Sequence, residues 1–160
     1  MKIVIADTTA LISLMIVNKL HLIVKAIGEY YVPNAVWDEI LNYSKVNKEI
    51  FGIEDISKRV INIKSMNYLK SIMDLGESEA VILYNELEAD YLLTDDSKAR
   101  QIAESIGVNC IGSIGILIKS KELGLISNLK EVFVVWVESG RFFSKTLLNE
   151  ILKMYNEELL

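Results

Sequence analysis

Apolar residues recur along this chain in short continuous runs and in longer amphipathic stretches, and the two patterns predict different elements. The short runs are rich in β-branched residues, as in Lys2–Ala6, which is typical of strands buried on both faces. The predicted strands are Lys2–Ala6, Tyr30–Val32, Val60–Ile63, Tyr91–Thr94 and Val108–Ile111.

The predicted helices occupy the segments between and after these strands. Pro33 is suited to the first turn of a helix, and Thr8 or Thr9 is expected to cap the first helix of the chain. Gly28 and Gly124 stand where a left-handed residue that closes a helix is expected, and Gly76 is expected to interrupt the chain before the helix Glu77–Glu88. The predicted helices are Ala10–Val17, Lys19–Ile27, Asn34–Tyr43, Tyr68–Met73, Glu77–Glu88, Ser97–Ile106, Ser113–Leu123, Ser127–Val137 and Ser144–Leu159, with Val132–Val137 alternatively a strand.

Strand and helix alternate from one end of the chain to the other, without an internal repeat, a low-complexity tract or a linker. This order predicts an α/β fold, a three-layer α/β/α sandwich around a central, mostly parallel sheet. The length of 160 residues predicts a single domain over 1–160, with a core over 1–124 and a C-terminal helical extension over 125–160.

Composition narrows the class of protein. With 51% hydrophobic residues, the chain is not intrinsically disordered. Its 17 basic and 22 acidic residues give a net charge of −5, which argues against a protein held on nucleic acid mainly by bulk positive charge. A nuclease remains compatible with this charge, because a cluster of metal-binding carboxylates itself lowers the net charge.

The chain has the features expected of a soluble, cytoplasmic protein. Its single cysteine, Cys110, permits no internal disulfide and fits a reducing compartment. Asp7 interrupts the first apolar run too early for a signal peptide, and apolar stretches such as Ile111–Ile118 are too short to span a membrane. His21 lies in an apolar stretch, so we interpret it as structural rather than as a metal ligand.

Acidic residues follow two of the predicted strands directly. Asp7 follows Lys2–Ala6, and Asp95 and Asp96 follow Tyr91–Thr94. Because ligands bind outside the carboxyl ends of the strands in open α/β sheets, we expect these acids to face a binding site. An aspartate between a strand and a helix is also a common N-cap, which is the alternative interpretation.

Further acids lie within the helices that surround these strand ends, namely Asp38, Glu39, Glu77 and Glu79. Taken singly, each is explained as a solvated helix residue or as an acid that complements the helix dipole. Carboxylates brought close together, however, cannot all remain ionised without a cation, and hard oxygen ligands suit Mg²⁺ or Mn²⁺. A metal held in this way activates a water molecule and neutralises charge on a phosphodiester.

Four segments resemble, in order and spacing, the motifs of PIN-domain nucleases. Ile5–Ile12 resembles the opening strand and first acid, and Val32–Ile40 resembles the proline and helix that carry the second. Leu75–Val81 and Leu92–Asp96 resemble the third and fourth motifs. The resemblance covers at least residues 1–118, and the tail, through Gly140–Phe142 and Leu147–Leu152, is similar to an uncharacterised prokaryotic branch of that family.

The resemblance implies a PIN-like fold and a metal-dependent endoribonuclease that uses Mg²⁺ or Mn²⁺ to cleave single-stranded RNA. It implies four catalytic and metal-binding acids, Asp7, Glu39, Glu79 and Asp96, with Glu77 and Asp95 secondary and Asp38 less favoured than Glu39. Glu79 departs from the toxin members of the family, in which an aspartate usually stands at this place. Many members are toxins held inactive by a small antitoxin protein, and many form dimers.

RNA must reach this acidic site, so basic and hydroxyl side chains are expected around it. The candidate substrate-binding residues are Thr9, Lys98, Arg100, Arg141 and Lys145, although ordinary surface charge also explains each basic residue. The high apolar content suggests that Ala10–Val17 and Lys19–Ile27 supply the face of a homodimer.

Two other functions compete with the nuclease interpretation. A phosphoryl-transfer or receiver domain would use Asp7 as a phosphorylated nucleophile, but a dehalogenase-like site needs an aspartate where this chain has Thr9, and the order of acids does not fit a receiver. The stronger alternative is a catalytically weak or inactive PIN-like module that binds nucleic acid or a partner protein.

Overall fold

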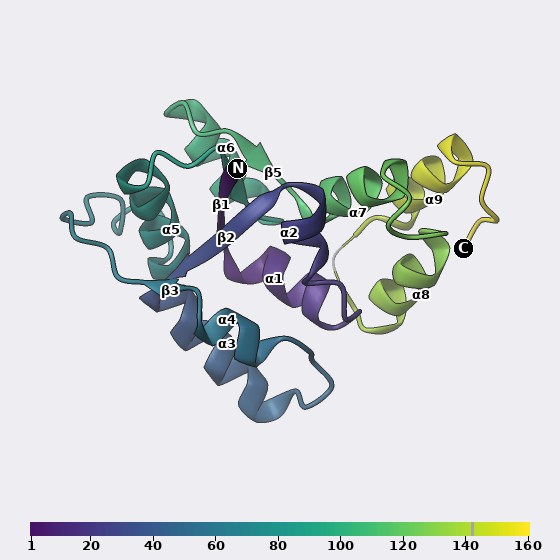
Figure 1. The fold of residues 1–160 in the computed structure, drawn as a ribbon, viewed down its shortest axis with the longest axis horizontal. Coiled ribbons are helices and arrows are strands. Elements are labelled where there is room, and N and C mark those ends of the chain that lie inside the picture. Colours follow the sequence, from purple (N-terminus) through teal and green to yellow (C-terminus); the bar gives the residue numbers. More distant parts are fainter. Residues whose placement is uncertain (142) are drawn as a thin grey trace.

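One parallel sheet forms the centre of the molecule, as the sequence predicts. The computed structural model describes residues 1–141 and 143–160, so Phe142 of the tail motif lies outside the described residues. The sheet has five strands in the order β3-β2-β1-β4-β5, and all neighbouring pairs run parallel (Figure 1). The strands are β1 Lys2–Ala6, β2 Gly28–Pro33, β3 Val60–Ile61, β4 Tyr91–Leu93 and β5 Cys110–Ile111.

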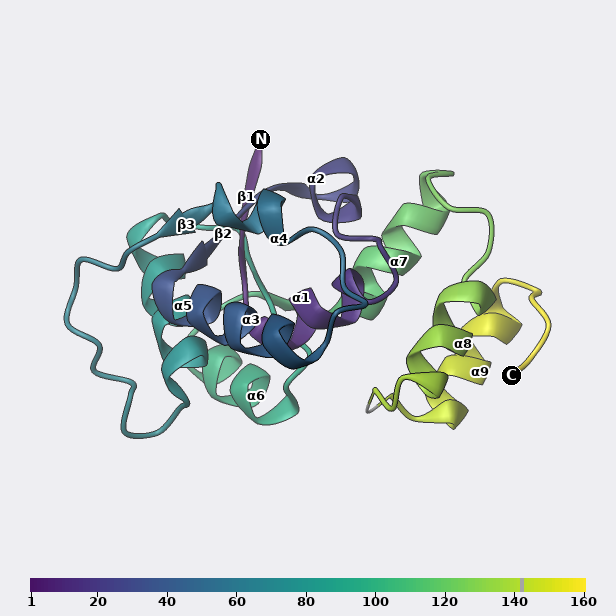
Figure 2. The ribbon, with the colours of Figure 1, turned by 90° about the horizontal axis from the view of Figure 1, so that it is seen from below.

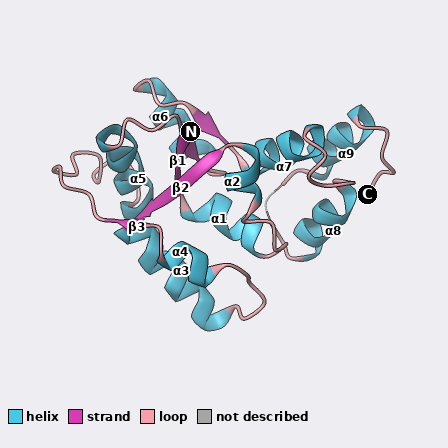
Figure 3. Ribbon diagram, in the orientation of Figure 1, coloured by secondary structure: helices cyan, strands magenta, loops and turns pink. Residues whose placement is uncertain are grey.

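Helices connect these strands and extend the chain beyond them (Figure 3). They are α1 Thr8–Met15, α2 Leu22–Ala26, α3 Asn34–Val46, α4 Ile53–Ser57, α5 Leu75–Glu86, α6 Ser97–Ser105, α7 Ser113–Glu122, α8 Lys130–Glu138 and α9 Lys145–Met154. The segment Val132–Val137, which was open to either interpretation, is helical in α8. The helix expected over Tyr68–Met73 is a hydrogen-bonded turn, in which Leu69 accepts from the amides of Ile72 and Met73.

The alternation of side chains along β1 divides the core into two layers. Val4 and Ala6 belong to a cluster that includes buried residues of α1, α2 and α7. Ile5 belongs to a second cluster, formed with buried residues of α5 and α6. Successive strand residues point to opposite faces, so these clusters lie on the two sides of the sheet. The predicted α/β/α sandwich is therefore confirmed.

Of the last two helices, α8 contacts α1, and α9 packs against α8. Trp136 of α8 is fully buried, and its indole Nε1 donates a 2.7 Å hydrogen bond to the carbonyl of Ser13. The Phe143 ring stacks on Trp136 with the ring centroids 4.3 Å apart. Figures 1 and 2 show α8 and α9 together at the end of the molecule, remote from β3 and α5.

Gly28 has a different role from the one expected, because it begins β2 instead of closing a helix. A Cβ atom at this position would collide with the carbonyl group of Lys2 on the neighbouring strand. Glycine is therefore needed for the close approach of two backbones. Gly124 does adopt the left-handed conformation predicted for it, with φ of 72°, after α7.

Much of the apolar surface expected to form a dimer face is buried within the chain. This applies to Ala10–Met15 in the segment Ala10–Val17, and to Leu22 and Ile23 in the segment Lys19–Ile27, so the dimer stays a prediction. Exposed large apolar side chains occur instead on the loop between β3 and α5, at Met66, Tyr68 and Ile72. No helix in the described part of the chain is long and apolar enough to cross a membrane.

Candidate carboxylate site

The carboxyl ends of β1 and β4 meet at the centre of the sheet. Ala6 pairs with Leu93 in the parallel ladder, and the amide of Asp7 donates a 2.8 Å hydrogen bond to the Leu93 carbonyl. The chain leaves β1 toward β2 on one side, while β4 lies on the other side. Such a switch in strand order opens a crevice at the carboxyl edge, where ligands bind in open α/β sheets.

Asp7 is buried in this crevice, with a side chain that is 2% exposed. Its Oδ1 accepts a 2.7 Å hydrogen bond from the amide of Thr8, and its Oδ2 accepts from the hydroxyls of Thr94 at 2.9 Å and Thr9 at 3.3 Å. Burial, with a smaller contribution from the charge of Glu39, raises the pKa of Asp7 to about 6. Its carboxylate forms no ion pair with a basic residue in the described part of the chain.

Glu39 approaches the same crevice from α3. Its Oε2 accepts a hydrogen bond from the Thr8 hydroxyl, at the start of α1. Its carboxylate also lies against α5, because a Cβ atom on Gly76 would stand 2.5 Å from Glu39 Oε1. Gly76 therefore does not interrupt a helix; it belongs to the first turn of α5 and leaves room for this carboxylate.

Glu77 and Glu79 of α5 have different surroundings. Burial raises the pKa of Glu77 to about 7, and the negative charges of Asp7 and Asp96 add to this effect. Burial also raises the pKa of Glu79, but the acids that affect it are Asp38 and Glu39 of α3. Glu77, which the sequence ranks as secondary, is therefore the α5 acid that is electrostatically coupled to both strand-end acids.

Asp95 and Asp96 both act as helix caps. Asp96 Oδ1 accepts a 2.7 Å hydrogen bond from the Ala99 amide and caps α6. Both oxygens of Asp95 are used by Ser113 at the start of α7, through its amide at 2.8 Å and its hydroxyl. The capping alternative thus applies to both residues, but Asp96 keeps one carboxylate oxygen without a hydrogen bond in the described residues.

Three threonines form hydrogen bonds to the acids of the site, and of these only Thr9 is predicted from the sequence as a site residue. Thr9 accepts a 3.1 Å hydrogen bond from the Asp95 amide while it donates to Asp7, so it joins the ends of β1 and β4. Thr94 and Thr8 position Asp7 and Glu39 respectively. The available signal for Thr94 was its place at the end of a strand that adjoins β1.

The basic residues that are candidates for binding substrate differ in their exposure and in their hydrogen bonds. Lys98 of α6 and Lys145 of α9 are exposed, whereas Arg100 is partly buried next to Gly112. Arg141 Nη2 donates to the carbonyl of Thr9 at 2.8 Å and to the hydroxyl of Ser13 at 2.9 Å. Arg141, which lies between α8 and α9, thus links this part of the chain to α1 by hydrogen bonds, instead of extending toward solvent.

The acids of the site have the chemistry of ligands for a divalent cation, but no three of their carboxylates converge on one point in the described residues. Asp7, Glu39, Glu77 and Asp96 offer only oxygen atoms, and burial together with mutual repulsion raises the pKa values of Asp7 and Glu77. Among the described residues, no three His, Cys, Asp or Glu side chains are grouped as ligands of one ion. The donor set therefore fits Mg²⁺ or Mn²⁺ in its chemistry.

The remaining candidates for chemistry lie outside this site. His21 is exposed and precedes α2 without a side-chain capping bond, so its side chain is not part of the core, contrary to the structural interpretation. Burial raises the pKa of the Cys110 thiol to about 11, which keeps it protonated and unreactive at neutral pH.

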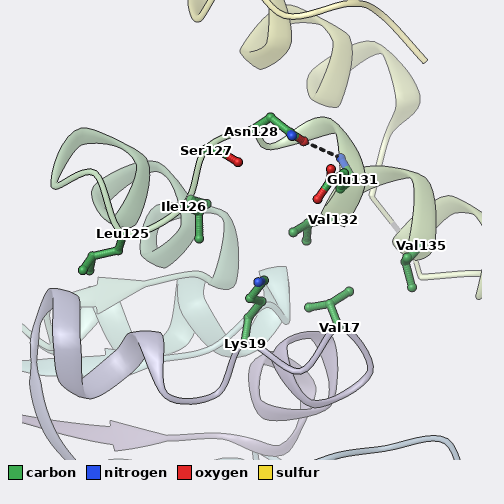
Figure 4. Close-up of a pocket in the computed structure, with 9 residues that line it drawn as sticks. All are labelled: Val17, Lys19, Leu125, Ile126, Ser127, Asn128, Glu131, Val132 and Val135. Carbon is green, nitrogen blue, oxygen red and sulfur yellow. Dashed lines mark hydrogen bonds between the residues drawn. The ribbon is translucent and has the colours of Figure 1, made fainter.

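Two cavities differ in their relation to the carboxylates. The α6–α7 cavity, of about 530 Å³, adjoins the site and is lined by residues that include Thr94, Asp96, Arg100, Ile111, Gly115 and Phe143. A cavity of about 380 Å³ lies beyond the C-terminal end of α1, between Val17 and Val132 (Figure 4). Since Asp7 caps the opposite end of α1, this second cavity is separate from the carboxylate site.

Comparison with known proteins agrees with the motifs and the fold. A family model described as a PIN domain matches residues 3–157, which is nearly the whole chain. No curated protein sequence matches the chain significantly.

Proposed function

Because the chain belongs to the PIN-domain family, we propose that it is a metal-dependent endoribonuclease that hydrolyses phosphodiester bonds in single-stranded RNA. The observation that supports this most is the environment of Asp7. Its carboxylate is 2% exposed, lacks a basic partner in the described residues, and is affected by the charge of Glu39. Concentrated negative charge of this kind is stabilised by a bound cation.

In this proposal, the metal ligands are Asp7, Glu39, Glu77 and Asp96, with Glu79 and Asp95 in supporting positions. A bound Mg²⁺ or Mn²⁺ lowers the pKa of a water molecule and neutralises charge that develops on the phosphodiester. Thr94 and Thr9 orient Asp7, and Thr8 orients Glu39, through their hydroxyl groups. Positioning by these hydroxyls reduces the reorganisation that metal binding requires.

In this proposal, the carboxyl group of Glu77 loses its proton when the metal binds. Because burial and the charges of Asp7 and Asp96 raise its pKa to about 7, its carboxyl group is protonated in a larger share of the metal-free molecules at neutral pH than that of an ordinary glutamate. Metal binding favours the ionised form, so it releases this proton, and the affinity for metal increases with pH.

The partners in this proposal are RNA, a small antitoxin protein and a second copy of the chain, with a cytoplasmic location. Exposed apolar side chains offer surface for a partner on the loop between β3 and α5, at Met66, Tyr68 and Ile72, and at Leu75, the first residue of α5. They are better placed for a partner protein than the buried residues of α1. A neighbouring gene for a short basic or ribbon-helix protein would support the role of toxin.

A PIN-like module without catalytic activity is the second candidate. It is favoured by one observation, that no three acids in the described residues are grouped around a point. This module would bind RNA or a partner protein, and added Mg²⁺ or Mn²⁺ would cause no cleavage.

The substitution Asp7→Asn tests the nuclease proposal. It keeps the size of the side chain and removes a charged metal ligand, so cleavage of unstructured RNA in Mg²⁺ or Mn²⁺ should decrease by at least ~10²-fold. Either metal should raise the melting temperature of the wild-type protein, because a ligand that binds the folded state stabilises it. This increase should be lost in the variant.

The matched control is Asp38→Asn, which removes an exposed carboxylate from α3, next to Glu39. It should retain cleavage within a few-fold. If Asp7→Asn cleaves RNA at the wild-type rate, the activity arises elsewhere and the nuclease proposal is wrong.

A further inference from the structure

The α6–α7 cavity shares a wall with the carboxylate site. It opens at the carboxyl ends of β4 and β5, and Thr94 and Asp96 belong to both. Its volume of about 530 Å³ lies within the range of ~300–1,000 Å³ typical of pockets for small ligands. A chain of nucleotides with one phosphate at the carboxylates would place a neighbouring nucleoside at this cavity.

One side of the cavity is apolar. Ile111 of β5 contributes to it, together with Ile114 and Ile118 of α7. Phe143 closes it from the segment before α9, and its stacking on the fully buried Trp136 fixes the ring. A flat aromatic ligand can make its contacts with such a surface without losing hydrogen bonds from its faces.

The same cavity is lined by a cation, Arg100, and by the carboxylates of Asp95 and Asp96. The Arg100 side chain forms no ion pair or hydrogen bond within the described part of the chain. Its Nη2 lies 3.4 Å from the position that a Cβ atom on Gly112 would occupy, at the start of α7. A free guanidinium next to apolar surface binds phosphate with two donors or stacks on a nucleobase.

Gly115 keeps the cavity open. It lies inside α7, where glycine is less favourable than alanine by ~0.5–1 kcal/mol, and no atom lies within 4 Å of the position of its absent Cβ. A larger side chain at this position therefore enters the space of the cavity rather than the packed core.

We propose that the α6–α7 cavity is a nucleobase subsite, which holds a base adjacent to the scissile phosphate of the RNA. The base packs between the isoleucines and Phe143, and Arg100 contacts the phosphate attached to its nucleoside. This subsite rests on the proposed nuclease function and deepens it, because it gives the enzyme a preference for the base next to the cleaved bond.

Binding of nucleoside 5′-monophosphates without added metal tests this subsite directly. The δ1-methyl NMR signals of Ile111, Ile114 and Ile118 should shift on titration with adenosine, guanosine, cytidine or uridine monophosphate. Ribose 5-phosphate carries the same sugar and phosphate without a base, so it should shift these signals little. Equal shifts with ribose 5-phosphate would show a phosphate site and overturn the nucleobase subsite.

Substitution at Gly115 provides the matched pair of variants. Gly115→Leu fills the cavity, so the dissociation constant of the preferred nucleotide should increase at least ~10-fold, in keeping with the loss of base stacking. Gly115→Ala adds only one methyl group and should change the constant less than about two-fold. Unchanged binding in Gly115→Leu would place the nucleotide elsewhere and overturn the proposal.

Phe143→Leu keeps the inference testable if Gly115→Leu fails to fold, as judged by its melting temperature. It preserves apolar contact but removes the aromatic ring, and it should weaken the binding of purine nucleotides more than that of pyrimidine nucleotides.

Cleavage of RNA separates the two proposals. RNA cleavage by wild-type protein without methyl shifts would overturn the subsite alone, whereas absence of both cleavage and nucleotide binding would overturn both.

Discussion

Glu77 and Glu79 stand two positions apart on α5, and this spacing turns their side chains to different neighbours. Residues two apart on a helix are separated by about 200° around its axis. Glu77 is consequently coupled to Asp7 and Asp96, while Glu79 is coupled to Asp38 and Glu39. Both are acidic and both precede the same apolar run, so only the packing of α5 separates their environments.

This difference predicts unequal effects of two similar substitutions. Glu77→Gln should reduce metal-dependent RNA cleavage by at least ~10²-fold, because it removes a charge next to Asp7. Glu79→Gln, the matched control on the same helix, should keep cleavage within about ten-fold. Steady-state rates on one unstructured RNA measure both, and a larger loss in Glu79→Gln would restore the order that the sequence favours.

The raised pKa of Asp7 predicts how stability depends on pH in the absence of metal. Its carboxyl binds a proton more tightly in the folded state, with a pKa of about 6, than in the unfolded state, with 3.8. The free energy of unfolding should therefore decrease as pH increases from about 4 to about 6, and Glu77 should extend the decrease toward pH 7.

For Asp7 alone, this loss is about 3 kcal/mol at most. Urea denaturation in EDTA at several pH values measures it, and Asp7→Asn should remove most of the decrease and be the more stable protein at pH 7. If wild-type stability increases steadily from pH 4 to pH 7, the burial of an uncompensated Asp7 carboxylate is contradicted.

Single residues also show what the sequence can predict about the site. The sequence correctly predicts that Asp7 and Asp96 follow the ends of strands. A strand that is apolar throughout ends where the first charged residue stands, and the carboxyl ends of parallel strands lie at the same edge of the sheet. The roles of Thr94 and Arg141 were not predictable in this way. Their partners, Asp7 and Ser13, lie far away in sequence, and only tertiary contacts bring them together.

At the scale of elements, the contact between α3 and α5 sets the position of Glu39. Gly76 stands in the first turn of α5, and its lack of a side chain leaves space for the Glu39 carboxylate. The sequence places a helix in this region, but it predicts an interruption at Gly76. The sequence alone does not distinguish a glycine that ends a helix from a glycine that leaves room for a neighbouring side chain.

Gly76→Ala should therefore impair the site without impairing the fold. Its Cβ would stand 2.5 Å from Glu39 Oε1, at the far end of a flexible side chain, so the carboxylate rotates away. Alanine is also the better helix former, so the melting temperature should change by no more than a few degrees. RNA cleavage should decrease by ~10-fold or more; cleavage at the wild-type rate would show that Glu39 is not needed where it stands.

Element boundaries were predicted where local signals were strong. The first strand, Lys2–Ala6, matches β1 at both ends because an apolar β-branched run meets a charged residue. The turn at 68–73 was mistaken for a helix because its apolar spacing suits one turn, but Leu69 accepts the hydrogen bonds of a single turn only. Gly28 was mistaken for a helix end, since the close passage of β1 beside it is not visible in the sequence.

At the scale of the whole molecule, the C-terminal helices complete the core instead of extending it. Leu129, Phe133 and Trp136 are fully buried in the cluster that contains α1 and β1. Arg141 donates two hydrogen bonds to α1, one to the hydroxyl of Ser13 and one to the carbonyl of Thr9, whose own hydroxyl donates to Asp7. The sequence predicted a single domain with a core over 1–124 and a C-terminal helical extension, and this packing leads us to expect that the core needs residues of the extension.

A fragment that ends at Gly124 should therefore fail to fold cooperatively. Burial of a Leu, Phe or similar side chain contributes about 2 kcal/mol, so the loss of Leu129, Phe133 and Trp136 with their partners on α1 approaches the 5–15 kcal/mol that stabilises a typical domain. Circular dichroism during heating should show a sigmoidal transition for the full chain and a broad one for the fragment. The control is the full chain with Lys145→Ala, which alters an exposed residue of α9 and should melt like the wild type. A fragment with a sharp transition within a few degrees of the full chain would show that 1–124 is an autonomous core and that the C-terminal helices are an accessory.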